Sequence, residues 1–173
     1  TLVVQSSSAT IAVLQNFASQ PGPDGVTSML GLAGAIPILL GDNIGTTITA
    51  LLASIGQTKD AKRTAVAHCI FNISGCLLFI WFVKPFAVLI QHISPKGPEV
   101  EVISRQIANA HTLFNITMTL IWVCLIKFMV KIVMTLIPDG KAVDMDSAKP
   151  VFLDDKIINQ PAAALQLVAK EIL

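Results

Sequence analysis

Long apolar runs, interrupted at a few places by short polar clusters, make up most of the first 137 residues of the chain. Residues 65–83 and 107–126 are each apolar over about 20 residues, the length that a helix needs to cross the hydrocarbon core of a bilayer. Two shorter apolar runs, at residues 85–93 and 128–137, are expected to lie along the membrane interface as amphipathic helices. The pattern predicts an all-α membrane protein built as a helical bundle.

Two polar clusters interrupt apolar arms that are too short to cross a bilayer. Gln5 to Ser8 separate two such arms, which predicts broken helices or the tip of a re-entrant hairpin. Residues 41–49 lie between two apolar runs and have the residue order of a helix start. Asp42 or Asn43 is expected to be the N-cap of a helix over residues 44–55. A helix start of this kind binds anions.

Both clusters also have a purely structural interpretation. Serine and threonine side chains commonly join helices in membrane bundles, and glycines four residues apart, such as Gly41 and Gly45, allow two helices to approach closely. For the second cluster this packing interpretation has about the same weight as a binding site. The three consecutive serines of the first cluster occupy more than one face of a helix, which weakens the packing interpretation there.

Residues 68–84 and 111–127 align without gaps and share polar as well as apolar positions, which we interpret as an internal repeat. The shared polar residues are a histidine, an asparagine and a lysine, at positions His68, Asn72, Lys84, His111, Asn115 and Lys127. An unpaired amide inside a spanning helix costs about 2–7 kcal/mol, so both asparagines are expected to face each other or the polar clusters. The histidines are interpreted as helix residues bonded to a neighbouring carbonyl, and a role in proton sensing stays open.

The charged residues outside the spans predict the orientation of the chain. Residues 57–64 and the region after Lys127 are basic, whereas residues 91–105 form a polar and nearly neutral loop. Because basic segments tend to stay in the cytoplasm, residues 57–64 and the C-terminal tail are placed there, and the 91–105 loop outside. Residues 138–160 are interpreted as a polar linker, and residues 161–173 as the start of a cytosolic helical domain.

The composition supports a membrane protein. Hydrophobic residues make up 53% of the 173, charged residues 13%, and the mean hydropathy is +0.70, whereas about a quarter of the residues of a soluble domain are charged. A formal charge of +1, with no lysine or arginine in the first 58 residues, excludes a nucleic-acid-binding surface. The three cysteines lie in apolar runs and are interpreted as buried hydrophobic residues rather than as a disulfide or a metal site.

Two polar clusters, each beside half-length apolar segments, are typical of the midplane substrate site of a secondary transporter. Hydroxyls, amides and main-chain N–H groups suit a tetrahedral oxyanion, and the oxygens of the same side chains suit a hard cation such as sodium. Thr46 and Thr49 share a helix face, so both are expected to contact one cation. A hydrolase that uses the first serine cluster, a repeat histidine and Asp42 is the weaker interpretation, because no serine lies in a G-x-S-x-G elbow.

Three motifs resemble those of the type II sodium-dependent phosphate cotransporter family. They are Gln5-Ser6-Ser7-Ser8, Gly41-x-Asn43-Ile44-Gly45-Thr46-Thr47, and Ala67-His68 followed by Phe71-Asn72-Ile73-Ser74-Gly75. The run Ala110–Asn115 resembles the bacterial branch of this family. The resemblance extends over residues 1–137, and the tail from Pro150 resembles the start of a phosphate-uptake-regulator-like cytosolic domain.

The resemblance implies a secondary active transporter, and not an enzyme, in which sodium is co-transported and no organic cofactor is bound. It also implies two inverted repeats, each with one Gln-Ser-Ser-Ser motif, so that residues 1–137 correspond to the second repeat. The first repeat, or a second copy of the chain, is then expected to complete the site. The protein is expected to cross the cell inner membrane several times.

The resemblance further implies roles for individual residues. Sodium is assigned to Gln5, Ser6, Thr46 and Thr49, and inorganic phosphate to Ser7, Ser8, Asn43 and Thr47. The supporting positions are Asp42, Gly45, Asn72 and Asn115. Asp42 stands where the family commonly has a small residue, so its carboxylate is expected either to add a cation ligand or to repel phosphate.

Sodium-coupled phosphate cotransport is the leading hypothesis from the sequence. Its alternative is a membrane scaffold or regulatory subunit without transport, in which the polar clusters only pack helices and the tail binds a cytosolic partner. An intramembrane serine hydrolase ranks third. The expected partners are phosphate, sodium, the lipid bilayer and the other half of the site, and nucleic acid is not among them.

Overall fold

The computed structural model describes Thr1 and residues 3–139 of the chain, and the unit discussed below is Thr1–Pro138. Its described residues are helical and contain no strand, which confirms the predicted all-α class. The elements are α1 (Ser7–Ala18), α2 (Gly31–Ala53), α3 (Lys59–Phe79), the 3-10 helix η1 (Ile80–Phe82), α4 (Val83–Ile93), α5 (Glu99–Cys124) and α6 (Ile126–Leu136). The predicted linker beyond Asp139 and the predicted helix at residues 161–173 lie outside the described residues.

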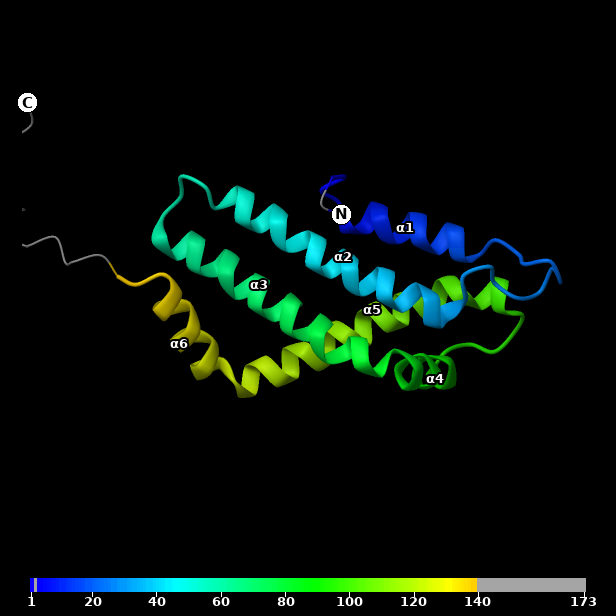
Figure 1. Ribbon diagram of the computed structural model, residues 1–173. Coiled ribbons are helices and arrows are strands. Elements are labelled where there is room, and N and C mark those ends of the chain that lie inside the picture. Colours follow the sequence, from blue (N-terminus) through cyan, green and yellow to red (C-terminus); the bar gives the residue numbers. More distant parts are fainter. Residues whose placement is uncertain (2, 140–173) are drawn as a thin grey trace, which may run out of the picture. The chain divides into compact units, whose positions relative to one another are not determined.

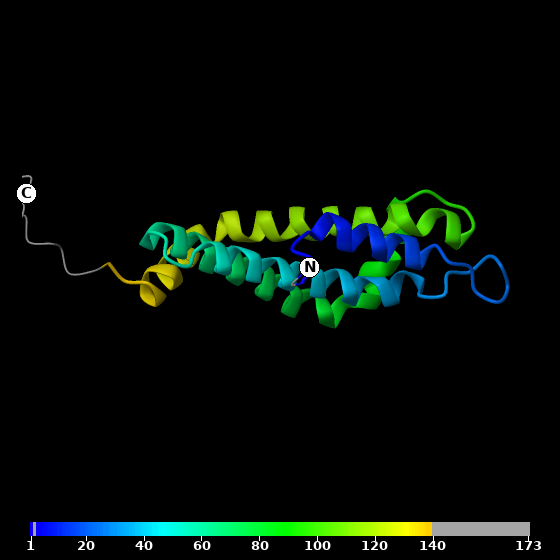
Figure 2. The same cartoon turned by 90° about the horizontal axis from the view of Figure 1, so that it is seen from above.

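Helix α2 is the central element of the bundle (Figure 1), where it packs against α1, α3, α4 and α5. Its buried apolar residues, among them Leu32, Ile36 and Leu39, recur every three or four positions and belong to the main hydrophobic core. Helix α1 packs against both α2 and α5 (Figure 2), and Gln15 Nε2 donates to Ser104 O of α5 at 3.0 Å. This packing holds the short helix α1 alongside α2.

Three helical segments are long and apolar enough to cross a bilayer: α2, the segment Lys59–Ile93, and α5. The last two contain the predicted spans 65–83 and 107–126, which confirms that part of the sequence interpretation. Helix α2 is a third candidate span. The sequence pattern predicted two shorter apolar arms there instead of one continuous helix.

The predicted helix start at Asp42 or Asn43 is wrong. Helix α2 begins at Gly31 and continues through Pro37 and through the polar residues 41–49. Pro37 removes only one main-chain N–H from the helix. The buried face of α2 continues from Leu32 into the polar stretch and ends at Thr47.

The side chains that the sequence pattern assigns to a helix cap form hydrogen bonds inside α2 instead. Asn43 Nδ2 donates to Leu39 O at 3.3 Å. Thr46 Oγ1 donates to Asn43 O at 2.6 Å, and Thr47 Oγ1 donates to Ile44 O at 2.7 Å. Bonds of this kind are compatible with a helix interior, so these polar residues do not interrupt the helix.

The internal repeat predicted from the sequence is also present in the helices. Helix α4 covers residues 83–93 and α6 covers residues 126–136, a displacement of 43 positions that also separates His68 from His111. In both copies a long helix is followed by a short break and an 11-residue helix. The repeat therefore includes the shorter helices, beyond the 17 residues that align in sequence.

The two copies of the repeat run in opposite directions (Figure 1), and each short helix packs on the long helix of the other copy. Helix α4 packs against α5, where Asn109 Nδ2 donates to Ser94 Oγ at 2.8 Å. Helix α6 packs against α3, where the Arg63 guanidinium donates to Ile137 O at 3.0 and 3.1 Å. In the segment from α3 to α6, two antiparallel long helices therefore each carry the short helix that follows the other one.

Helices α3 and α5 come close together at Gly75. A Cβ atom at this position would lie 2.7 Å from Phe114 Cζ and 3.0 Å from Met118 Cγ. Phe114 is fully buried, and its ring packs edge-on against Phe79 with 5.1 Å between the ring centroids. Gly75 thus permits the close contact of two helices that small residues commonly permit in membrane bundles.

The loop between α4 and α5 is shorter than the predicted loop 91–105, which is a correction to the sequence interpretation. Only residues 94–98 separate the two helices. Pro98 precedes α5, and Glu99 and Glu101 lie in its first turn, where negative charge is favourable because the N-terminus of a helix is the positive end of its dipole. The acidic residues that made the segment polar are therefore part of a helix start.

The loop that joins α1 to α2 is organised by Asp24. Its carboxylate accepts hydrogen bonds from the main-chain N–H groups of Thr27 (2.9 Å) and Val26 (3.0 Å) and from the Thr27 hydroxyl (2.7 and 2.8 Å). The bonds from Thr27 are the main reason why the pKa of Asp24 lies below its usual value.

The substitution Gly75→Ala is expected to destabilise the bundle by about 1–3 kcal/mol, because the new methyl group has to displace the Phe114 ring. Thermal unfolding of the purified protein in detergent measures the effect as a lower midpoint. Gly41→Ala is the matched control: Gly41 also lies in a spanning helix, but a Cβ atom there meets nothing within 4 Å. An equal midpoint for Gly75→Ala and the wild type would contradict the close contact of α3 and α5.

Candidate functional site

The first polar cluster is the start of α1. Ser6 is the N-cap, and its Oγ accepts a hydrogen bond from Ala9 N at 3.3 Å. Gln5 has a φ of 53°, a left-handed conformation that is uncommon outside glycine and sets the end of the helix. With 12 residues, α1 is about 18 Å long and cannot cross the hydrocarbon core. The predicted interruption at the first cluster is thus the N-terminus of a half-length helix.

The start of α1 lies beside the middle of α2 (Figures 1 and 2). Thr1 contacts both helices: its amino nitrogen lies 3.5 Å from Asp42 Oδ1 of α2, and its hydroxyl donates to Thr10 Oγ1 of α1 at 3.2 Å. Thr10 Oγ1 in turn donates to Ser6 O at 2.9 Å. The two polar clusters, which are more than 30 residues apart in the sequence, are therefore neighbours in the structure.

The candidate residues differ in their burial. The buried ones are Asp42, Asn43 and Thr47 on α2 and Asn72 on α3. The half-buried ones are Ser6, Ser7, Gly45, Thr46, Thr49 and Asn115, and the exposed ones are Gln5 and Ser8. Exposed polar groups within the hydrocarbon core need either water or another protein surface.

The threonines of α2 present acceptor atoms to a ligand. Thr46 and Thr47 donate their hydroxyl hydrogens to main-chain carbonyls, so the lone pairs of both oxygens remain for other partners. Lone pairs suit a cation, and Thr46 therefore fits the sodium role that the resemblance gives it. Thr47, which the resemblance assigns to phosphate, has to give up its bond to Ile44 O before it can donate to an oxyanion.

The donors for an oxyanion lie at the start of α1. Ser7 and Ser8 are the first two residues of this helix, and the first N–H groups of a helix have no carbonyl partner within it. Together with the serine hydroxyls they form a set of donors suited to phosphate. The helix start that the sequence analysis predicts in the second cluster, on α2, is therefore found in the first cluster, on α1.

Asn72 lies on the face of α3 that packs against α2. Two cysteines on the same face contact α2 carbonyls, since Cys76 Sγ lies 3.1 Å from Leu40 O and Cys69 Sγ lies 4.0 Å from Thr47 O. These contacts are on either side of Asn72, which is 4% exposed. The sequence analysis missed that the two cysteines contact α2. Their spacing of three and four residues from Asn72 is a signal that all three share one helix face.

The two repeat asparagines are bonded in the same way. Asn72 Nδ2 donates to His68 O at 3.0 Å, and Asn115 Nδ2 donates to His111 O at 2.8 Å. Each side-chain amide thus donates one of its hydrogens to the main-chain carbonyl of the histidine one turn earlier in the same helix. The asparagines were predicted to face each other or the polar clusters, but both of these hydrogen bonds go to a carbonyl of the same helix.

Asp42 is the only charged side chain that is buried among the residues the structure describes. Neither carboxylate oxygen accepts a hydrogen bond from these residues, because the Thr1 amino group, at 3.5 Å, lacks hydrogen-bond geometry. A buried ion left without a partner costs roughly 3–5 kcal/mol, so the site favours a positively charged ligand.

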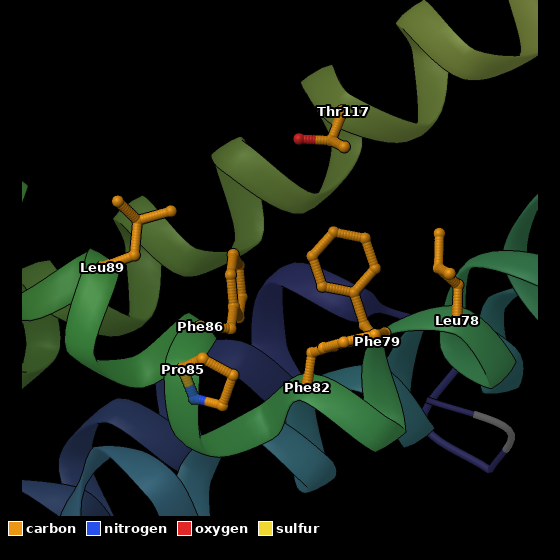
Figure 3. Close-up of a pocket in the computed structure, with 7 residues that line it drawn as sticks. All are labelled: Leu78, Phe79, Phe82, Pro85, Phe86, Leu89 and Thr117. Atoms are coloured by element: carbon orange, nitrogen blue, oxygen red, sulfur yellow. The ribbon is translucent and has the colours of Figure 1, made fainter.

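One cavity lies away from this polar region, between α3, α4 and α5 (Figure 3). It has a volume of about 380 Å³ and is lined by apolar side chains and by Thr117. The rings of Phe79 and Phe86, whose centroids are 4.9 Å apart, form part of its wall. This cavity has too few polar groups to replace the hydration shell of a phosphate ion.

The described residues contain no group of three or more histidine, cysteine, aspartate or glutamate side chains that could hold a metal ion. Transition metals in proteins are bound mainly by such groups. The oxygen-rich set around Asp42 and the threonines is instead of the type that binds hard cations.

Comparisons with known proteins agree with the motifs. A family model described as Na+/Pi-cotransporter matches residues 1–95. The uncharacterised protein YqeW of Bacillus subtilis is 35% identical over 95 residues, which cover 55% of this chain and 29% of that protein. Human sodium-dependent phosphate transport protein 2B is 40% identical over 93 residues, which cover 51% of this chain and 12% of that protein.

A third relative, human sodium-dependent phosphate transport protein 2C, is 44% identical over 61 residues, or 33% of this chain and 10% of that protein. The matches thus span less than a third of the length of these relatives, and no solved structure matches the chain. The family model covers more than half of the chain and includes both polar clusters, α2 and α3. The chain belongs to the Na+/Pi-cotransporter family.

Proposed function

We propose that this chain takes part in sodium-coupled cotransport of inorganic phosphate and forms one wall of the binding site. The observation that carries the proposal is the position of the α1 start beside the middle of the candidate span α2. Unpaired N–H groups and hydroxyls on α1 suit an oxyanion, and the outward lone pairs on α2 suit a cation. Half-length helices that end at such a point are typical of secondary transporters.

The proposed roles of the residues follow from their chemistry and from the family. Sodium is assigned to Gln5, Ser6, Thr46 and Thr49. Phosphate is assigned to Ser7, Ser8, Asn43 and Thr47. Gly45, Asn72 and Asn115 support the site by packing and by holding polar groups, and no organic cofactor is needed.

The opposite wall is proposed to come from a first repeat or from a second copy of the chain. The exposure of Gln5 and Ser8 supports this, because their polar groups need a partner within the bilayer. This exposure also favours transport over a scaffold. In a scaffold, the side chains of Gln5 and Ser8 would pack against other helices of the bundle. We place the chain in the bacterial branch as a second repeat, followed by a regulator-like cytosolic tail.

The substitutions Gln5→Ala and Thr46→Val are each expected to lower sodium-dependent phosphate uptake by about tenfold or more at low sodium concentration. Each removes an oxygen ligand of a cation, an interaction of roughly 1.5–3 kcal/mol. The measurement is the uptake of labelled phosphate by vesicles that contain the full-length protein, over a series of sodium concentrations.

Two matched controls test whether the effect belongs to the site. Thr135 makes the same kind of bond as Thr46, from Oγ1 to Lys131 O at 2.8 Å, but lies on α6, so Thr135→Val should leave uptake unchanged. Gln20→Ala in the exposed α1–α2 loop should do the same. Uptake that survives both Gln5→Ala and Thr46→Val would remove these residues from the site.

The proposed orientation in the inner membrane has residues 57–64 and the C-terminal tail in the cytoplasm and residues 94–98 outside. In a variant without native cysteines, Lys59→Cys is expected to react with an impermeant maleimide only from the cytoplasmic side, and Lys96→Cys only from the outside. The segment Lys59–Ile93 separates the two positions and is long enough to cross the membrane. Reaction of both cysteines from one side would contradict this orientation.

A further inference from the structure

A lysine lines a cavity at the surface of the bundle, where α2, η1 and α4 meet. The cavity has a volume of about 510 Å³, and its lining includes Ala33 and Pro37 of α2, Ile80 and Trp81 of η1, and Lys84 of α4. Lys84 is the charged residue in this lining, and the other side chains are aliphatic or aromatic. The cavity therefore combines one positive charge with apolar walls.

The Lys84 ammonium group has no acidic partner among the residues that the structure describes. Asp42, which is also on α2, follows Ala33 by nine residues, or two and a half helical turns, so it lies on the opposite side of that helix. The other acidic residues of the described chain lie outside the elements that line the cavity: Asp24, Asp60, Glu99, Glu101 and Asp139. The charge of Lys84 therefore favours an anion in the cavity.

The cavity also offers a main-chain acceptor. Pro37 has no N–H group, so the carbonyl of Ala33, four residues earlier in α2, lacks its usual helical donor. Both residues line the cavity, and both are exposed. A ligand that satisfies the cavity therefore carries a negative charge for Lys84 and a hydrogen-bond donor for Ala33 O.

Two apolar stripes lead from the cavity toward the middle of α2 and α3. One starts at Pro37 and the other at Ile80, and each continues at spacings of three or four residues, which keep its members on one helix face. The exposed members beyond the cavity are Gly41 and Ile44 on α2 and Leu77 and Ile73 on α3. The apolar surface of the cavity thus extends along both helices.

The two stripes run side by side over the depth of one lipid leaflet. Helices α2 and α3 pack along each other (Figure 1), and Cys76 Sγ lies 3.1 Å from Leu40 O, next to Leu77 and Gly41 in the sequence. From Ala33 to Ile44 an α-helix rises about 16 Å, which is close to half of the hydrocarbon core of about 30 Å. One acyl chain of a lipid occupies this depth.

We propose that the cavity and the two stripes bind one phospholipid with an anionic headgroup that also carries hydroxyl donors, such as phosphatidylglycerol. Lys84 binds the headgroup phosphate, Ala33 O accepts a hydrogen bond from a headgroup hydroxyl, and an acyl chain lies along the stripes. Trp81, which is 83% exposed, lies at the level of the headgroups, where tryptophan is common. A free phosphate ion would use only Lys84, whereas a phospholipid also covers the apolar surface.

Quenching of Trp81 fluorescence by brominated lipids tests this site in a bilayer. The full-length protein, with Trp81 as its only tryptophan, is reconstituted into mixtures of phosphatidylcholine and phosphatidylglycerol, and bromine is placed on the chains of one lipid at a time. Phosphatidylglycerol should bind beside Trp81 about fivefold more strongly than phosphatidylcholine, the ratio expected from one lysine near an anionic headgroup. Lys84→Gln should lower this ratio to about one, and Lys84→Arg should keep it.

Two controls separate the site from general effects of charge. Lys127 is the repeat equivalent of Lys84 and lies on α6, so Lys127→Gln should leave the ratio at Trp81 unchanged. Brominated phosphatidylmethanol, an anionic lipid without a headgroup hydroxyl, should bind more weakly than phosphatidylglycerol, because it cannot donate to Ala33 O. Equal binding of these two anionic lipids would remove Ala33 O from the site.

Equal quenching by phosphatidylglycerol and phosphatidylcholine, or an unchanged ratio in Lys84→Gln, would overturn the inference. Absence of quenching by either lipid would overturn it as well, because a protein surface, such as the first repeat or a second copy, would then cover the cavity. If the single-tryptophan variant does not fold, thermal unfolding in detergent gives the same comparison. Phosphatidylglycerol should then raise the midpoint of the wild type and of Lys127→Gln more than that of Lys84→Gln, and equal increases would contradict the site.

Discussion

Polar groups in the hydrocarbon core of a bilayer have no water to bond, and this constraint explains most of the arrangement around α2. The amides and hydroxyls of Asn43, Thr46 and Thr47 bond to carbonyls of their own helix, so α2 remains helical through its polar stretch. The buried side-chain atoms left without a partner among the described residues are the Asp42 oxygens and Gln106 Oε1. The Asp42 oxygens lie beside the start of α1, where main-chain N–H groups also lack partners. Unpaired acceptors on α2 and unpaired donors at the start of α1 thus belong to two helices that pack against each other, and the candidate site is placed there rather than in a cavity.

The helices that follow α2 are held together by crosswise packing. Helix α4 packs on α5 and α6 packs on α3, so each short helix contacts the long helix of the other copy. Helix α2 packs against both α3 and α5, so it is in contact with both copies of the repeat. The near absence of space at Gly75 limits how α3 and α5 slide past each other without a movement of Phe114.

Much of the fold follows from the hydrophobic pattern, and the differences have a physical cause. The spans at residues 65–83 and 107–126 and the repeat were predictable, because long apolar runs and repeated polar positions are local properties of the sequence. The helix start on α2 was predicted wrongly because Asp, Asn and Thr favour caps only when their side chains have no better partner. In α2 the carbonyls one turn earlier are such partners. The loop 91–105 was predicted too long for a related reason, since acidic residues stabilise a helix start as readily as they mark a loop.

The candidate site was predictable in its components but not in its geometry. The sequence identifies both polar clusters, yet only the packing of α1 on α2 shows which cluster supplies donors and which supplies acceptors. This distinction matters for coupling, because the first 58 residues provide no fixed cation for phosphate. In a site that contains a buried carboxylate and no lysine or arginine, an anion gains favourable electrostatic energy only after a cation has bound. In the proposed function, residues 1–58 offer phosphate no fixed positive charge, so the co-transported ion would have to supply it.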